Sequence, residues 1–162
     1  ENPRFLLRRL IIFASEDVGV ADPRALPMAV AAADGFDRVG MPEGRILLAN
    51  ITAFLATAPK SNSAYMGLEK AAKTVRETGA LDVPLPLRST AAGLDSSLGY
   101  GQGYRYPHDY GGYVAQQYLP DELSGHVFYE PTENGYEARI GQWLRAQRTP
   151  EGNDGEGEEN AG

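Results

Sequence analysis

A run of glycine, proline and tyrosine at residues 99–118 constrains the fold of this chain most. Six of the nine tyrosines lie there, in GYGQGYRYPHDYGGYVAQQY. Glycine and proline prevent a regular helix or strand over most of this segment. Each tyrosine has a large apolar ring and a hydroxyl that needs a partner, so the segment must pack against something. We predict either a structural loop laid across a helical core or a recognition surface for a partner.

The composition is that of an ordinary globular protein. The chain has 162 residues, of which 42% are hydrophobic and 23% are charged, enough to bury a core without disulfides. It contains no cysteine and two histidines, which excludes disulfides, thiolate metal sites and a histidine cluster. No apolar run reaches the roughly 18 to 20 residues of a membrane span, so we expect no membrane partner. A reducing, cytoplasmic setting with no cofactor or metal in this chain fits these features.

The net charge of −7 comes mostly from the end of the chain. Residues 149–162 carry five acidic side chains and no basic one, which leaves 17 acidic and 15 basic residues before them. Apart from one alanine this tail has no aliphatic or aromatic anchor, so we predict a helical domain over 1–148 and a disordered acidic tail over 149–162. Because the folded part is nearly neutral, bulk charge predicts neither strong attraction to nucleic acid nor strong repulsion.

Apolar residues at three- to four-residue steps predict four helices in the first half of the chain. They cover residues 3–18, 22–36, 42–58 and 61–75. Pro3 suits the first helical position, and Asp22 and Ser61 can each cap a helix. The third helix must stop before Pro59, because the residue before a proline avoids the helical conformation. The alanines of the second helix predict close packing between helices.

The second half of the chain has fewer regular signals. We predict an extended segment at 82–88, a short helix at 91–98, a helical turn at 120–123, a short strand at 126–129 and a last helix that Asn134 caps and that runs through Leu144. Together these elements predict an all-α fold. It would be a compact helical domain of about five to seven helices with a long Tyr/Gly-rich loop and at most a short β-hairpin.

Catalytic motifs are weak throughout. No Gly-Lys-Ser/Thr phosphate loop occurs, and the glycine spacing at 99–109 does not match a dinucleotide-binding loop. Glu16, Asp17 and Asp22 could gather as acid/base or metal groups, but a cap and a polar turn explain them as well. His108 and Asp109 could be half of a catalytic triad, yet we interpret them as a polar pair that fixes the loop. A small-molecule hydrolase that uses these residues is one rival hypothesis.

Interface and DNA contact are the other possibilities. Large aromatic side chains and arginine suit a protein interface, and we predict packing or interface roles for Arg4, Tyr65, Tyr100, Tyr104, Tyr106 and Tyr113. In the DNA hypothesis Lys60, Arg88 and Arg105 would contact phosphates while tyrosines stack on bases. This second rival predicts binding that weakens as salt rises.

Several short strings occur in an order that resembles one known family. They are SEDVG from Ser15, ADPRA from Ala21, APKSN from Ala58, VPLPLR from Val83, GYGQGYRYPHD from Gly99, QYLP from Gln117, and YEPT with GYE between Tyr129 and Glu137. Together they resemble the C-terminal region of the replication-associated recombination protein A family (RarA, also called MgsA), which is related to the Werner-helicase-interacting ATPases. One departure is visible, since the family usually has a histidine where this chain has Pro86 and Asn-Ala where it has Ser89-Thr90.

The resemblance implies a parent protein that is an AAA+ ATPase acting at stalled or damaged replication forks. Its Walker motifs, ATP and Mg would lie upstream, and this chain would begin near the end of the ATPase lid region. In the family the C-terminal part is helical, supplies no hydrolytic residue and assembles the protein as a homotetramer. The resemblance therefore implies a cytoplasmic, nucleoid-associated parent that meets DNA and replication proteins, and an oligomerisation role for this chain.

Overall fold

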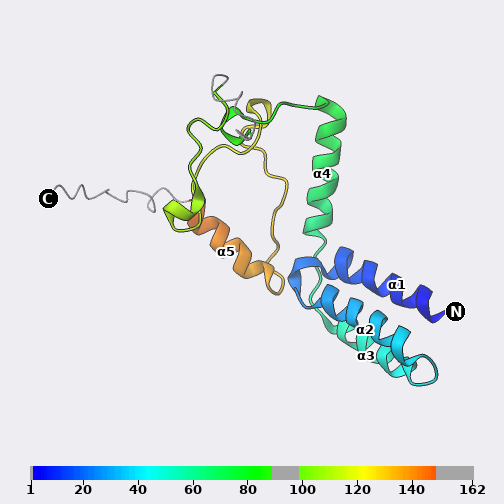
Figure 1. Cartoon of the computed structure of the whole chain (residues 1–162). Coiled ribbons are helices and arrows are strands. Elements are labelled where there is room, and N and C mark those ends of the chain that lie inside the picture. Colours follow the sequence, from blue (N-terminus) through cyan, green and yellow to red (C-terminus); the bar gives the residue numbers. More distant parts are fainter. Residues whose placement is uncertain (1, 89–98, 149–162) are drawn as a thin grey trace. The chain divides into compact units, whose positions relative to one another are not determined.

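A computed structural model describes residues 2–88 and 99–148, and these residues form an all-α structure (Figure 1). The helices are α1 (Pro3–Phe13), α2 (Ala25–Val39), α3 (Gly44–Thr57), α4 (Ser63–Thr78) and α5 (Glu137–Arg148). No strand occurs within the described residues. The all-α fold class predicted from the sequence is confirmed.

The described residues divide into two compact units. The first, which we call the helical unit, contains Glu1–Glu77 and Val127–Gln142. The second, which we call the loop unit, contains Thr78–His126 and the chain from Trp143 on. The predicted domain limit at residue 148 stays a prediction, and the predicted acidic tail lies outside the described residues.

In the helical unit α1, α2 and α3 pack against one another, side by side (Figure 1). Their shared core contains three alanines together with larger aliphatic residues, and its members are Ala14, Val18, Ala25, Ala29, Ile51 and Leu55. An alanine at a contact lets two helix backbones approach closely because no long side chain separates them. The prediction of close packing by the alanines of the second helix is thus confirmed.

Large side chains of α2 lie on its outer surface. Leu26, Met28 and Val30 are exposed, whereas Ala25 and Ala29 are buried. The apolar residues of this helix are therefore too many for one contact face. Phe36 is buried with the two alanines, whereas Leu26, Met28 and Val30 stay outside, where they add to an apolar surface.

The predicted helix ends agree closely with the structure. Asn2 Oδ1 accepts a hydrogen bond from the Arg4 N–H at the start of α1, and a wider turn at Ala14–Val18 carries the chain on to Gly19, as predicted. Helix α2 begins at Ala25, two residues later than a helix that opened at Pro23. Helix α4 begins at Ser63, whose N–H donates to Ser61 Oγ at 3.2 Å, so the predicted cap is confirmed.

The predicted strand at 126–129 is wrong, because this segment runs beside α4 and pairs with no strand among the described residues. A Cβ added to Gly67 of α4 would lie 3.1 Å from the carbonyl oxygen of Phe128, so the two backbones nearly touch. Alternating side chains predicted a strand, but alternation alone does not supply a partner for the backbone. A glycine in α4 lets an extended segment dock on the helix instead.

The loop unit consists of extended segments and single turns of 3₁₀-helix. The turns lie at Leu85–Leu87, Pro107–Tyr110 and Asp121–Leu123. The last of these confirms the turn predicted at 120–123, and the first interrupts the extended segment predicted at 82–88. The helix predicted at 91–98 lies outside the described residues. None of the described helices is long and apolar enough to cross a membrane.

Candidate functional site

Glu137 is the best-defined polar site of the helical unit. Its side chain is fully buried at the first position of α5. Oε2 accepts from Ser61 Oγ at 2.6 Å, from Thr132 Oγ1 at 2.7 Å and from the Thr132 N–H at 2.9 Å. Oε1 accepts from Tyr129 OH at 2.8 Å and from the hydroxyl of Ser63. Five donors therefore surround one carboxylate.

The hydrogen bonds keep this carboxylate ionised. Burial by itself raises the pKa of Glu137, but the donors from Ser61, Ser63 and Thr132 favour the charged form and lower its pKa to about 2. Burial and the hydrogen bond to Glu137 raise the pKa of Tyr129 to about 12, so this phenol stays a donor. The Glu137 carboxylate therefore stays ionised and accepts hydrogen bonds from the same donors across the ordinary pH range.

The carboxylate connects three stretches of chain that are far apart in the sequence. It bonds the start of α4, the segment 129–132 and the start of α5. Neighbouring backbone contacts reinforce the junction, because the Tyr136 N–H donates to Ala21 O at 2.8 Å and Asn134 Nδ2 donates to Lys60 O at 2.9 Å. Gly135 has φ +55°, and a Cβ there would collide with Ala21 O. We assign this site a structural role, because a buried carboxylate saturated with donors offers no free oxygen to a substrate.

Sequence reasoning missed the role of Glu137. The strings that carry the family resemblance contain the carboxylate and all of its donors except Ser63, in APKSN, YEPT and GYE. A glutamate at the start of a helix is ordinarily read as a surface residue, so the pattern did not predict its burial. The usable signal was the presence of Ser61, Thr132 and Glu137 in three separate motif strings.

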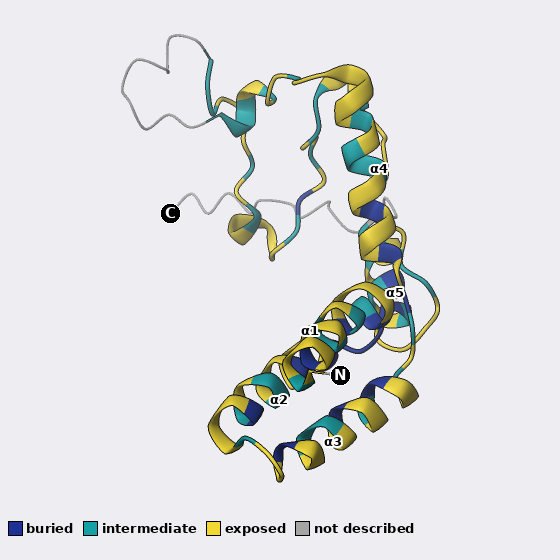
Figure 2. Ribbon diagram, turned by 90° about the vertical axis from the view of Figure 1, so that its right-hand side faces the viewer, coloured by how far each residue is buried: buried dark blue, intermediate teal, exposed yellow. Residues whose placement is uncertain are grey.

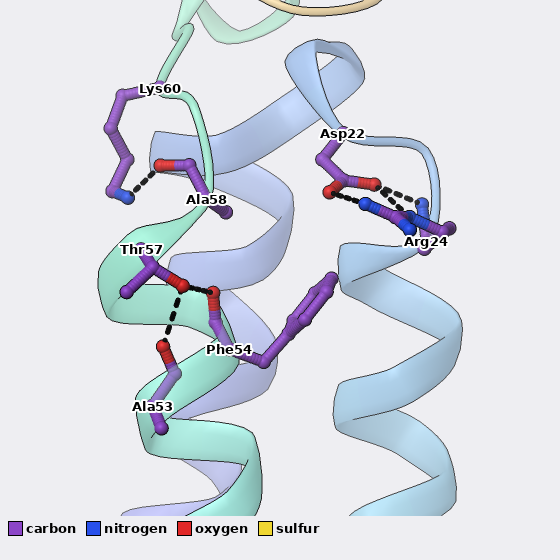
Figure 3. Close-up of polar contacts among 7 residues, drawn as sticks. All are labelled: Asp22, Arg24, Ala53, Phe54, Thr57, Ala58 and Lys60. Carbon is purple, nitrogen blue, oxygen red and sulfur yellow. Dashed lines mark hydrogen bonds and ion pairs between the residues drawn. The ribbon is translucent and has the colours of Figure 1, made fainter.

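The predicted acidic residues have separate local roles, and Figure 3 shows Asp22 with its partner Arg24. Glu16 and Asp17 are exposed in the turn after α1. Asp22 is buried, and its carboxylate accepts from the Arg24 N–H at 3.0 Å, from Nε at 2.9 Å and from Nη2 at 2.8 Å. The hydrogen bond from the Arg24 side chain is the main reason why the pKa of Asp22 is lowered. Within residues 2–88 and 99–148, no three His, Asp or Glu side chains are placed to hold a metal ion.

Lys60, a predicted DNA contact, closes the end of α3 (Figure 3). Its ammonium donates to Leu55 O at 2.8 Å and to Ala58 O, and lies 5.6 Å from the centre of the Phe13 ring. These carbonyls are among those that a helix leaves without partners at its C-terminus. Contact with a phosphate would therefore compete with the helix cap.

The other two predicted DNA contacts belong to the loop unit and also have local partners. Arg88 donates to Val83 O at 2.6 Å and pairs with Asp82 at 3.2 Å. The Arg105 guanidinium lies 4.5 Å from the centre of the Tyr110 ring. DNA contact by Lys60, Arg88 and Arg105 stays a prediction that would require each to exchange an internal partner for phosphate.

The predicted interface tyrosines differ in how far they are exposed. Tyr100 is half-buried beneath Arg88, and the half-buried Tyr113 ring meets the Trp143 ring edge-on at 5.9 Å. Tyr104 and Tyr106 are exposed. Ring contacts join Tyr100 to Arg88 and Tyr113 to Trp143, as expected for a packed aromatic segment. Interface roles for these residues stay predictions.

The predicted polar pair, His108 and Asp109, lies in the loop unit. Gln116, which the sequence analysis did not single out, holds this loop through two hydrogen bonds to the Arg105 backbone, at 3.1 and 2.9 Å. The His108 ring contacts that of Tyr106 at 5.0 Å, and the Asp109 N–H donates to Tyr106 O. The proposed pairing of His108 with Asp109 stays a prediction.

In the helical unit Arg4 forms an exposed ion pair with Asp37 at 3.0 Å. Tyr65 lies in the wall of a shallow groove between the end of α1 and the start of α4. Its phenol ring is partly exposed there, beside Ile12 and Leu68. An interface role for Arg4 and Tyr65 stays a prediction.

Comparison with known proteins gives the context of this site. Replication-associated recombination protein A of Escherichia coli K12 is 43% identical over 151 residues, which are 90% of this chain and 34% of that protein. Its namesake from Bacillus subtilis 168 is 42% identical over 131 residues, 80% of this chain and 31% of that protein. ATPase WRNIP1 of Dictyostelium discoideum is 35% identical over 131 residues, 80% of this chain and 15% of that protein. The chain thus spans about a third or less of the length of these curated relatives.

The match to a family model covers the whole described structure. The model is that of the MgsA AAA+ ATPase C terminal, and it matches residues 1–148. That range contains Glu137, all of its donors and every motif string on which the resemblance rests. The chain therefore belongs to the family of C-terminal regions of MgsA AAA+ ATPases.

Proposed function

We propose that this chain is the C-terminal homo-oligomerisation region of a RarA-like AAA+ ATPase that acts in replication-associated recombination and fork repair. It would set the number of subunits, four in our proposal, and hold ATPase domains at a fixed spacing. ATP, Mg and hydrolysis would belong to the upstream part of the longer protein. The names of the relatives support the process, and the exposed apolar surface of the helical unit supports the role in assembly.

That apolar surface is the observation on which the proposal rests. Several large apolar side chains of the helical unit are more than half exposed, and these are Val39, Met41, Ile46, Leu68 and Val75. Val39, Met41 and Ile46 lie around the connection from α2 to α3, and Leu68 and Val75 lie on α4. Single exposed apolar residues are normal on monomers, but groups of them are typical of surfaces that a partner covers. Homo-oligomers are the commonest way to cover such a surface in a soluble assembly.

Light scattering of the chain over a dilution series tests this function. We expect a mass near four times 17.5 kDa that falls only at high dilution. A mass of 17.5 kDa at every concentration would contradict the proposal.

A shift of labelled forked DNA by the chain at low salt would instead support direct DNA contact, and that shift should weaken steeply as salt rises.

In the longer protein we propose a cytoplasmic, nucleoid-associated location, with DNA and replication proteins as partners. The names of the relatives support these partners, whereas a basic surface does not, since Lys60, Arg88 and Arg105 have internal partners. We therefore propose assembly as the role of this chain and DNA binding as a role of the longer protein.

A further inference from the structure

Helix α4 has two faces of different character, and its inner face is already occupied. Gly67 lies against the backbone at Phe128, as described above. One turn further on, Lys70 pairs with Glu130 at 3.1 Å. The buried positions of this helix are Ser63 and Gly67, so its small residues face the rest of the helical unit.

The opposite face of α4 carries a narrow apolar stripe formed by Tyr65, Leu68, Ala72 and Val75. The steps of three, four and three residues place all four on one side of the helix, with the spacing of a helix-pairing seam. Leu68 is 64% exposed and Val75 is 62% exposed. Figure 2 shows the same pattern, with α4 largely exposed and its buried positions confined to the first turns.

At its N-terminal end the α4 stripe is continuous with more apolar surface. The shallow groove beside Tyr65 and Leu68 is also lined by Ile12, which is 43% exposed. The stripe and the groove together form one apolar surface over α4 and the end of α1. Side chains that enter such a groove would extend the contact beyond one helix.

Two opposite charges lie on the same flank of the α4 stripe. Glu69 and Arg76 are seven residues apart and therefore nearly in line along the helix. Neither forms an ion pair with any part of the chain that the structure describes, whereas the neighbouring Lys73 and Glu77 pair with each other at 3.8 Å. The other flank, at Ala64 and Ala71, carries no charge.

We propose that a second copy of this chain packs on the α4 stripe, with the two α4 helices antiparallel about a two-fold axis. In an antiparallel pair like flanks meet, so Glu69 of each copy faces the flank that carries Arg76 of the other. A parallel pair would place this charged flank against the uncharged one and leave both ions unpaired. The self-complementary charges and the small Ala72 near the crossing favour a copy of the same chain over an unrelated helix. This inference rests on the proposed assembly function and names the seam.

The first test places charges in the seam and measures the mass of the whole chain by light scattering. The double variant Leu68→Glu/Val75→Glu should reduce the mass at least twofold while circular dichroism stays helical. The matched control is Val83→Glu, in the loop unit, where the side chain is 53% exposed and lies outside the apolar surface of the helical unit. We expect the control to keep the unmodified mass. An unchanged mass for the double variant, or an equal loss for the control, would overturn the assignment to α4.

The second test uses charge reversal, which leaves the apolar stripe intact and so separates pairing from folding. Glu69→Arg alone should raise the concentration of half-dissociation by roughly tenfold, and so should Arg76→Glu. The double variant Glu69→Arg/Arg76→Glu restores opposite charges across an antiparallel seam and should return close to the unmodified value. Additive losses in the double variant would overturn the antiparallel pairing.

The outcomes distinguish this seam from the assembly function itself. If the unmodified chain is a monomer at every concentration, both the function and the seam are wrong. If the unmodified chain is a tetramer and all α4 variants remain tetrameric with unchanged dissociation, the function stands and the seam lies on another surface.

Discussion

The helical unit and the loop unit of this protein are stabilised in different ways. The helical unit has a core of alanines, valine, isoleucine and leucine, together with the buried Glu137. In the described part of the loop unit, Val114 is the one buried hydrophobic residue. Hydrogen bonds from Gln116 and ring contacts such as that of Tyr113 with Trp143 hold this unit.

This difference shows that secondary structure and stability need not come from the same source. Apolar burial and a buried ionic site favour cooperative unfolding of the helical unit. A unit held mainly by exposed polar and ring contacts opens locally at a much lower cost in free energy. We therefore expect the loop unit to be the more adaptable surface, and the helical unit to be the scaffold that carries the α4 stripe.

The largest expected effect comes from removing the carboxylate of Glu137. Glu137→Ala should lower the free energy of unfolding by about 3 to 5 kcal/mol, because several buried donors lose their acceptor. Urea denaturation followed by far-ultraviolet circular dichroism measures this loss. The matched control is Glu130→Gln, whose side chain is 67% exposed in its pair with Lys70, and its effect should stay below about 1 kcal/mol. Equal effects of the two variants would show that the buried carboxylate stabilises the helical unit no more than an exposed ion pair does.

The same carboxylate predicts how stability depends on pH. The pKa of Glu137 is lowered from 4.5 to about 2 in the folded state, so its contribution is complete above pH 4.5. It is lost as the pH falls from about 4.5 to about 2, and the total is about 3 kcal/mol. Denaturation of the unmodified chain and of Glu137→Gln over this range isolates the effect from other carboxylates. Parallel pH profiles for the two proteins would show that Glu137 titrates normally.

A local effect should follow from removing Gln116 in the loop unit. Its amide makes both hydrogen bonds to the Arg105 backbone, so Gln116→Ala should speed hydrogen exchange at the Arg105 N–H by roughly tenfold. The free energy of global unfolding should change by less than about 0.5 kcal/mol. Gln117→Ala is the control, since Gln117 bonds to Leu119 and Asp121 and leaves Arg105 protected. A large global loss in Gln116→Ala would mean that the two units unfold together.

The sequence predicted features that depend on neighbouring residues, and it failed where a feature depends on residues far away in the chain. The ends of α1, α3 and α4 depend on residues next to them, such as Pro3, Pro59 and Ser61, so local patterns predicted them well. The fold class followed from the same spacing. The short strand was wrong because its fate depends on Gly67, some 60 residues away, which lets the segment dock on α4.

The polar site could not be predicted for the same physical reason. Ser61 and Glu137 are 76 residues apart, and their presence in separate motif strings does not by itself indicate that they meet. The basic residues predicted to contact DNA give the opposite case. The sequence does not indicate a partner for Lys60, but in the structure its ammonium donates to a carbonyl at the end of α3. Charge in a sequence indicates what a side chain can bind, whereas the fold decides whether an internal partner binds it first.

The smallest expected effect probes the ring contact of the loop unit. Tyr113 and Trp143 meet edge-on, and such a pair contributes about 0.5 to 1.5 kcal/mol beyond the area that it buries. In a double-mutant cycle the double variant Tyr113→Leu/Trp143→Leu should therefore destabilise the loop by less than the sum of the losses in the two single variants. The readout is hydrogen exchange at Val114, the buried residue beside Tyr113, because global unfolding would mask a local change. Strict additivity would mean that the rings only touch. Coupling would show that aromatic contacts, in place of an apolar core, order this unit.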